Sequence, residues 1–278
     1  MFDLNSFIDT QSATRELSML NYIVGLLLIS NSITAAECLP KNDLSFPKSV
    51  DKNLLGDDLG LQMRVENQIN HFKSVMSSIV KKQMKKQLLI KLDWDNPRVN
   101  ASATRDDDNN PVLIILGGMA RHPQLSPDGL YGILCHELGH HLAGTPKKRR
   151  GRSTKLSWSS AEGQADYFAT TSCLPEIFKR PNYSVNPSAY SDSKEVSYAL
   201  QICEGEEDCA RVNLAGLSMA RVFASLKDYG EFPRLDAKDY NEAWETDLGH
   251  PRPQCRLDTY KAGVFLLKRP SCWFKEDL

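Results

Sequence analysis

The run HELGH at residues 136–140 constrains this 278-residue chain more than any other feature. Residues four apart on a helix project from one face, so His136 and His140 can bind one metal ion together. Glu137 lies about 100° further round the helix axis. That position makes it an awkward third ligand but lets it reach a water molecule bound to the metal. The spacing therefore predicts the metal helix of a zinc hydrolase.

The flanking residues predict that this run is helical. Ser126 supplies an N-cap, Pro127 fits the first helical position, and Asp128 places a negative charge at the positive end of the helix. Gly144 offers a stop at the other end. An apolar stripe is formed by Leu130, Ile133, Leu134, Leu138 and Leu142. Packing of this stripe into a core would hold the metal face in place.

A second stretch offers a third ligand. Residues 159–170 read SSAEGQADYFAT, a serine cap before a predicted helix on which Glu162 and Asp166 share one face. A carboxylate from a second helix can complete a His-His-Glu zinc site whose fourth position stays open for water. The sequence thus predicts one zinc ion bound by His136, His140 and Glu162. Asp166 can accept the spare ring N–H of a zinc histidine and fix its tautomer.

These residues resemble a known family. Metzincins are excluded, because they need glycine and histidine where this chain has Ala143 and Pro146. HELGH followed by Glu-x-x-Ala-Asp resembles the gluzincin metallopeptidases of the CAAX-prenyl-protease, HtpX and BepA type. Residues 99–103 and 111–119 are similar to two strands of that family, and His250-Pro251 with Arg256 is similar to its late His-Pro signature. The resemblance covers residues 88–266 and fits the soluble periplasmic members better than the membrane-embedded ones.

The resemblance implies an α+β, mainly helical fold with a small β-sheet beside the metal helix. It favours residues 112–116 as an edge strand that pairs with an extended peptide substrate. Ile114, Leu116 and Gly117 would then bind substrate. The alternative, a buried central strand, is nearly as well supported by the continuous apolar run.

The late signature implies two further site residues. The loop of His250 would return this side chain to the metal, either to hydrogen-bond the oxyanion of the reaction or to occupy the open zinc position as an inhibitory plug. The first role is catalytic and the second requires the histidine to move. Arg256 would support Asp166 or the loop itself.

The first residues predict export. Residues 22–29 form an apolar run too short to span a bilayer, and Thr34-Ala35-Ala36 suits signal-peptidase cleavage. We therefore predict a secretory signal at residues 1–36 and a periplasmic or secreted location. Because the region before the run is poorly basic, an uncleaved anchor, a buried N-terminal helix and translation from Met19 are alternatives.

The remaining chain, 37–278, is predicted to be one metallopeptidase domain without a transmembrane helix. It divides into an N-terminal helical part (37–87), a catalytic core (88–266) and a C-terminal tail (267–278). The formal net charge of −1 and the 25% charged residues give no reason to expect nucleic-acid binding. The expected partners are a peptide or protein substrate and, through peripheral contact, the cell envelope.

Seven cysteines agree with an oxidising compartment. Cys203 and Cys209 flank a turn in CEGEEDC, a spacing compatible with a local disulfide, and Cys255 and Cys272 are candidates for another. The odd count leaves at least one thiol unpaired within the chain. Cys135, inside the metal helix, is a candidate for that thiol and is interpreted as a core residue.

Helical periodicity continues outside the site. It predicts helices over 57–90, 193–202 and 207–229, with a surface loop at 233–248 that crosses the site. Residues 146–152, PKKRRGR, are interpreted as a mobile, solvated connection, with selection of acidic substrates or contact with anionic lipid as alternatives. His71 and His122 are interpreted as surface or core histidines and not as ligands.

The sequence therefore predicts a zinc-dependent endopeptidase. Zinc would lower the pKa of its bound water to about 7 and polarise the scissile carbonyl. Glu137 would take the water proton and deliver it to the leaving amine. The alternatives are a chaperone-like or self-inhibited zinc protein that binds unfolded envelope proteins, and a zinc hydrolase acting on cell-wall amides.

Overall fold

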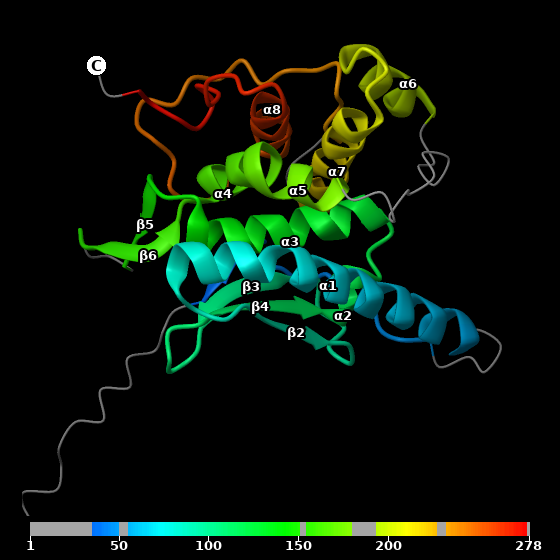
Figure 1. Cartoon of the computed structure of the whole chain (residues 1–278). Helices are drawn as coiled ribbons and strands as arrows, with labels where there is room; N and C mark the ends of the chain where they lie inside the picture. The colour runs from blue at the N-terminus through cyan, green and yellow to red at the C-terminus, as the bar shows by residue number, and fades with distance from the viewer. Residues whose placement is uncertain (1–34, 50–54, 151–153, 180–192, 227–231, 277–278) are drawn as a thin grey trace, which may run out of the picture. The chain divides into compact units, whose positions relative to one another are not determined.

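The computed structural model of the chain describes residues 35–49, 55–150, 154–179, 193–226 and 232–276. The predicted signal at 1–36 lies outside these residues except for Ala35 and Ala36. The described residues form an α+β fold with a small sheet (Figure 1). Its elements are β1 (Ala36–Glu37), α1 (Leu55–Met84), β2 (Leu89–Asp93), β3 (Ala101–Arg105), β4 (Pro111–Leu116), α2 (Gly117–Ala120), α3 (Pro127–Leu142), β5 (Lys147–Arg149), β6 (Leu156–Ser160), α4 (Glu162–Phe168), the π-helical turn η1 (Ala169–Cys173), α5 (Leu174–Phe178), α6 (Ser193–Ile202), α7 (Glu207–Ala224) and α8 (Pro253–Val264).

The main sheet has four strands in the order β1-β3-β4-β2. β3 is antiparallel to both of its neighbours, and β2 is parallel to β4. A separate two-stranded sheet is formed by β5 and β6. β1 and β2 are therefore the edges of the main sheet.

The prediction that residues 112–116 form an edge strand is wrong. Within β4, Ile114 lies opposite Ser102 on one side and Lys91 on the other. Backbone groups of β4 are thus paired on both sides, which suits its apolar run because a strand inside a sheet is buried. Leu116 and Gly117 likewise have no open edge beside them: Leu116 ends β4 opposite Asp93, and Gly117 begins α2.

The metal helix of the sequence prediction is α3, and it lies between two layers. It packs against β3 and β4 on one side and against α4 and α7 on the other (Figure 1). Every residue from Asp128 to His141 is buried. The predicted apolar stripe therefore understates the burial, because the polar face of α3 also lies inside the protein.

The N-terminal cap of α3 forms as predicted. Ser126 accepts a hydrogen bond from the Gly129 amide at 3.0 Å, and Pro127 occupies the first turn. This cap satisfies one of the amides that a helix start leaves open. The cap and the two layers together fix the position of α3.

The expected helix 193–202 is α6 with the same bounds, and two other expected helices end earlier than predicted. The expected helix 57–90 is α1, which ends at Met84, and the expected helix 207–229 is α7, which ends at Ala224. One hydrophobic core runs through these elements and the inner face of the sheet. Among the described residues, no helix is both long and apolar enough to cross a bilayer.

Three disulfides join six of the seven cysteines. Cys203–Cys209 and Cys255–Cys272 form as expected from the sequence. The prediction that Cys135 is a candidate free thiol is wrong, because Cys135 is bonded to Cys173 with a Cα–Cα distance of 5.6 Å. The free cysteine is Cys38, which is buried.

Candidate metal centre

Two close contacts bring α3 and α4 together at the site. The first is at Gly139, where a Cβ atom would lie 2.9 Å from the Ala165 backbone, so only glycine allows this approach. The second is the Cys135–Cys173 disulfide, which ties α3 to the turn that follows α4. The glycine of HELGH therefore has a structural role, because it lets the two helices that carry the predicted ligands touch.

The structure brings the three predicted ligands together. His136 Nε2 lies 3.1 Å from Glu162 Oε2, and His140 Nε2 lies 3.6 Å from Glu162 Oε1. All three side chains are fully buried. They form a group of donor atoms within 4.8 Å of one another that could hold a metal ion.

The donor atoms lie close together and are not used in hydrogen bonds among the described residues. His136 Nε2, His140 Nε2 and Glu162 Oε2 are buried and have no hydrogen-bond partner among the described residues, although the first and last are close together. Ligands of one tetrahedral ion with bonds near 2.1 Å lie about 3.4 Å apart. The observed separations of 3.1 and 3.6 Å bracket this value. The residues present therefore fit a four-coordinate cation.

The Nδ1 atoms of His136 and His140, on the side of each ring away from the cluster, each contact an oxygen atom. His136 Nδ1 contacts Asp166 Oδ1 at 2.7 Å, and His140 Nδ1 contacts the Ser160 carbonyl at 2.9 Å. In each pair the ring N–H at Nδ1 donates to oxygen, so Nε2 is the ring nitrogen that faces the cluster. Asp166 thus lies where the sequence placed it.

A buried network holds Asp166 in turn. Arg256 donates to its two carboxylate oxygens at 2.8 and 2.7 Å, which is the first of the two roles that the family resemblance implies for it. Tyr260 adds a hydrogen bond at 2.6 Å to Oδ1. The sequence analysis missed Tyr260, although it follows Arg256 by one turn of α8 and so shares its face. The network orients the ring of His136.

Glu137 differs from the ligands. Its carboxylate is fully buried, and neither oxygen has a hydrogen-bond partner among the described residues. One oxygen lies within 4.8 Å of a His136 ring nitrogen and of the Cys38 sulfur. Burial raises the pKa of Glu137 to about 8. This side chain is therefore next to the cluster and free to interact with a molecule that enters it.

Charges in the cluster shift the other titrations. Burial lowers the pKa of His136, but the charge and hydrogen bond of Asp166 outweigh burial and raise it to about 9. Burial lowers the pKa of His140 to about 3. For Glu162, burial is opposed by Lys148 and the histidines, which hold its pKa well below the usual range. Glu162 is thus an anion available to a cation.

Lys148 is a site residue that the sequence analysis missed. The interpretation of residues 146–152 as a mobile connection is wrong for its first half, because Lys147–Arg149 form β5 and pair with β6. This hairpin directs Lys148 into the site, where its Nζ lies 2.5 Å from Glu162 Oε1. Lys147 points elsewhere and donates to the Trp158 carbonyl.

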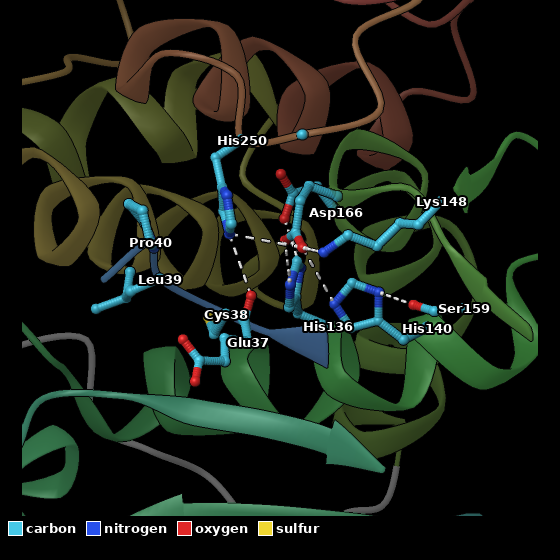
Figure 2. A network of polar contacts seen from close by, with 12 residues as sticks. Glu37, Cys38, Leu39, Pro40, His136, His140, Lys148, Ser159, Asp166 and His250 are labelled. Atoms are coloured by element: carbon cyan, nitrogen blue, oxygen red, sulfur yellow. Dashed lines mark hydrogen bonds and ion pairs between the residues drawn. The ribbon is translucent and has the colours of Figure 1, made fainter. Parts of the chain in front are cut away.

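His250 also reaches the cluster. Its Nε2 lies 3.6 Å from Glu162 Oε1 and 3.1 Å from the Glu37 carbonyl oxygen. Its ring stacks on Phe223 with 5.9 Å between centroids. Figure 2 shows His136 and His140 of α3 converging with Lys148 of β5 and with His250, which precedes α8. His250 therefore lies close to the predicted ligands although it is far from α3 in the sequence.

Other predicted residues lie away from the cluster. His122 contacts Ser225 at 2.9 Å, and the ring of His71 packs against Tyr131.

Comparison of the chain with models of known protein families, with curated proteins and with solved structures finds no match in any of the three. The gluzincin resemblance thus stays a prediction that rests on the motifs and their spacing.

Proposed function

We propose that the chain is a zinc-dependent endopeptidase with a zincin-like site, held by His136, His140 and Glu162. The observation that carries the proposal is the unpartnered, buried carboxylate of Glu137 beside this cluster. A structural zinc site is closed by four protein ligands and has no use for an adjacent base. A buried carboxylate without a partner is costly, and a role in proton transfer accounts for it.

The residues divide the reaction between them. Bound zinc would supply a Lewis acid that lowers the pKa of water and polarises a peptide carbonyl. Glu137 would accept the proton of the attacking water and give it to the leaving amine. Asp166 and Arg256 would keep the His136 ring oriented. His250 would donate from Nε2 to the carbonyl oxygen as negative charge develops there.

Disulfide content supports an exported protein. Three disulfides persist best in an oxidising compartment. We therefore keep the periplasm or the extracellular space as the proposed location. The predicted signal peptide is consistent with it.

Cleavage of an unfolded protein tests the proposal. The zinc-loaded chain should degrade unfolded casein, a chelator should stop it, and zinc should restore it. Glu137→Gln should keep the zinc and lose turnover by a factor of about 100 to 10,000, the usual contribution of a general base. Equal cleavage by zinc-loaded Glu137→Gln would reject the mechanism.

One observation favours a second function. His250 Nε2 lies 3.6 Å from Glu162 Oε1, a separation that would let both atoms bind one ion, and the three predicted ligands are fully buried. The site therefore resembles a closed one. A chaperone-like zinc protein would have such a site. It would protect an aggregating client without cutting it, and this protection would persist in Glu137→Gln.

A further inference from the structure

We propose that residues Glu37–Leu39, which follow the predicted cleavage point, occupy the substrate groove of the metal centre and act as a built-in competitor that keeps the site closed. This inference rests on the proposed endopeptidase function and names how that site is regulated. Four observations carry it: the pairing of the segment, the contacts of its carbonyls, the position of Cys38 and the burial of the centre.

The segment binds β3 as an added strand. Glu37 lies opposite Ser102, and the Cys38 amide donates to the Ala101 carbonyl at 3.0 Å. Extended peptides commonly bind proteins by adding a strand to a sheet edge in this way. Without this segment, β3 would be the open edge next to the metal centre.

Asn100 extends the attachment by one residue. Its side chain accepts a hydrogen bond from the Leu39 amide at 3.1 Å and donates to the Leu39 carbonyl at 3.3 Å. Leu39 itself is buried in the core. The segment is therefore anchored at both the backbone and the side chain.

Site residues hold two successive carbonyls of the segment. His250 contacts the Glu37 carbonyl at 3.1 Å, and Arg256 donates to the Cys38 carbonyl at 3.3 Å. A peptide substrate would present its carbonyls to such donors. Figure 2 shows the segment passing below His250 with the Glu37 carbonyl directed toward that ring.

The side chain of Cys38 fills the space beside the base. It is 1% exposed, and its sulfur lies within 4.8 Å of a Glu137 oxygen. Glu137 and the three ligands are all fully buried with the segment in place. A polypeptide from outside can reach Glu137 only after the segment moves, so occupancy and catalysis exclude each other.

Release of the segment is tested with Leu39→Asp in the full chain. The buried charge should unseat the segment, while Lys41→Asp places the same charge at an exposed position nearby and serves as the control. After zinc loading, a colorimetric chelator should remove the ion from Leu39→Asp about tenfold faster than from the wild type, and casein cleavage should rise by a similar factor. The control should match the wild type.

An engineered disulfide that holds the segment on β3 gives the opposite test, because it keeps the segment in place instead of releasing it. Glu37 and Ser102 face each other across two strands, and such pairs lie within the Cα distances that a disulfide spans. Glu37→Cys with Ser102→Cys, in a Cys38→Ser background, should abolish casein cleavage when oxidised. The same chain without Ser102→Cys is the control.

The two readouts separate this inference from the proposed function. Faster zinc removal from Leu39→Asp without casein cleavage by any variant would support the segment's role and reject the peptidase. Full cleavage by the chain with the engineered disulfide, or equal zinc removal from folded Leu39→Asp and wild type, would overturn the inference.

Discussion

Buried polar groups have hydrogen-bond partners near the start of α3, whereas several near its end have none among the described residues. Near its start, Asp128 is fully buried and receives two hydrogen bonds from Arg211, at 3.1 and 2.9 Å. Near its end, His136, Glu137 and His140 keep buried atoms without hydrogen-bond partners among the described residues. Each such atom costs about 1 to 3 kcal/mol. The first end therefore stabilises the fold, whereas the second keeps donor atoms available for a ligand.

Removal of the Asp128–Arg211 ion pair near the start of α3 should have the largest effect, and that effect should be on the free energy of unfolding. Arg211→Met keeps the contact with the Phe178 ring but leaves the Asp128 carboxylate without its guanidinium. Loss of one partner of a buried ion pair costs about 3 to 5 kcal/mol of unfolding free energy. Urea unfolding measures this loss, and zinc affinity should stay unchanged.

A double variant sharpens this test. Asp128→Asn combined with Arg211→Met removes both charges, so much of the lost stability should return. If the double variant is as unstable as Arg211→Met, the buried charge is not the cause. If zinc affinity falls in either variant, the two ends of α3 are not independent.

Loss of the Asp166 contact that orients His136 should have a smaller effect, and that effect should be on metal affinity. Asp166→Asn removes the charge that orients His136 while keeping the size of the side chain. Loss of such a partner lowers metal affinity about 10- to 100-fold. Chelator competition measures it, with Asp236→Asn on the exposed Arg234 pair as the control. Equal losses in both variants would contradict a specific role for Asp166.

The smallest effect should come from Lys148→Met, and it should have the opposite sign. The ammonium lies 2.5 Å from Glu162 Oε1, where it competes with a cation for that oxygen and repels it. Its removal should raise zinc affinity by up to about tenfold. Lys147→Met, on the same hairpin, should leave the affinity unchanged. A fall in affinity for Lys148→Met would instead make it a residue that orients Glu162.

Local periodicity predicts which side chains meet at the candidate site. His136 and His140 are one turn apart, as are Glu162 and Asp166, so helical geometry alone predicts which side chains share a face. The apolar stripe of α3 is predicted by the same periodicity. The complete burial of α3 was not predicted, because α4 and α7 cover the face that periodicity assigns to polar residues.

The errors arose where contacts are distant in sequence. β4 became a central strand because β2 pairs beside it in parallel, an arrangement that neither segment specifies alone. Cys135 forms a disulfide with Cys173, which lies 38 residues further along the chain. Cys38 lies beside the site because it follows the two-residue strand β1. Lys148 reaches Glu162 because a hairpin reverses the chain. These contacts depend on packing, which residue spacing does not encode.

The most direct test of the central claim is a crystal structure of the zinc-soaked protein with anomalous scattering measured at the zinc edge. We expect one peak about 2.0 to 2.2 Å from His136 Nε2, His140 Nε2 and a Glu162 oxygen. A peak elsewhere, or none at these atoms in zinc-saturated crystals, would contradict it.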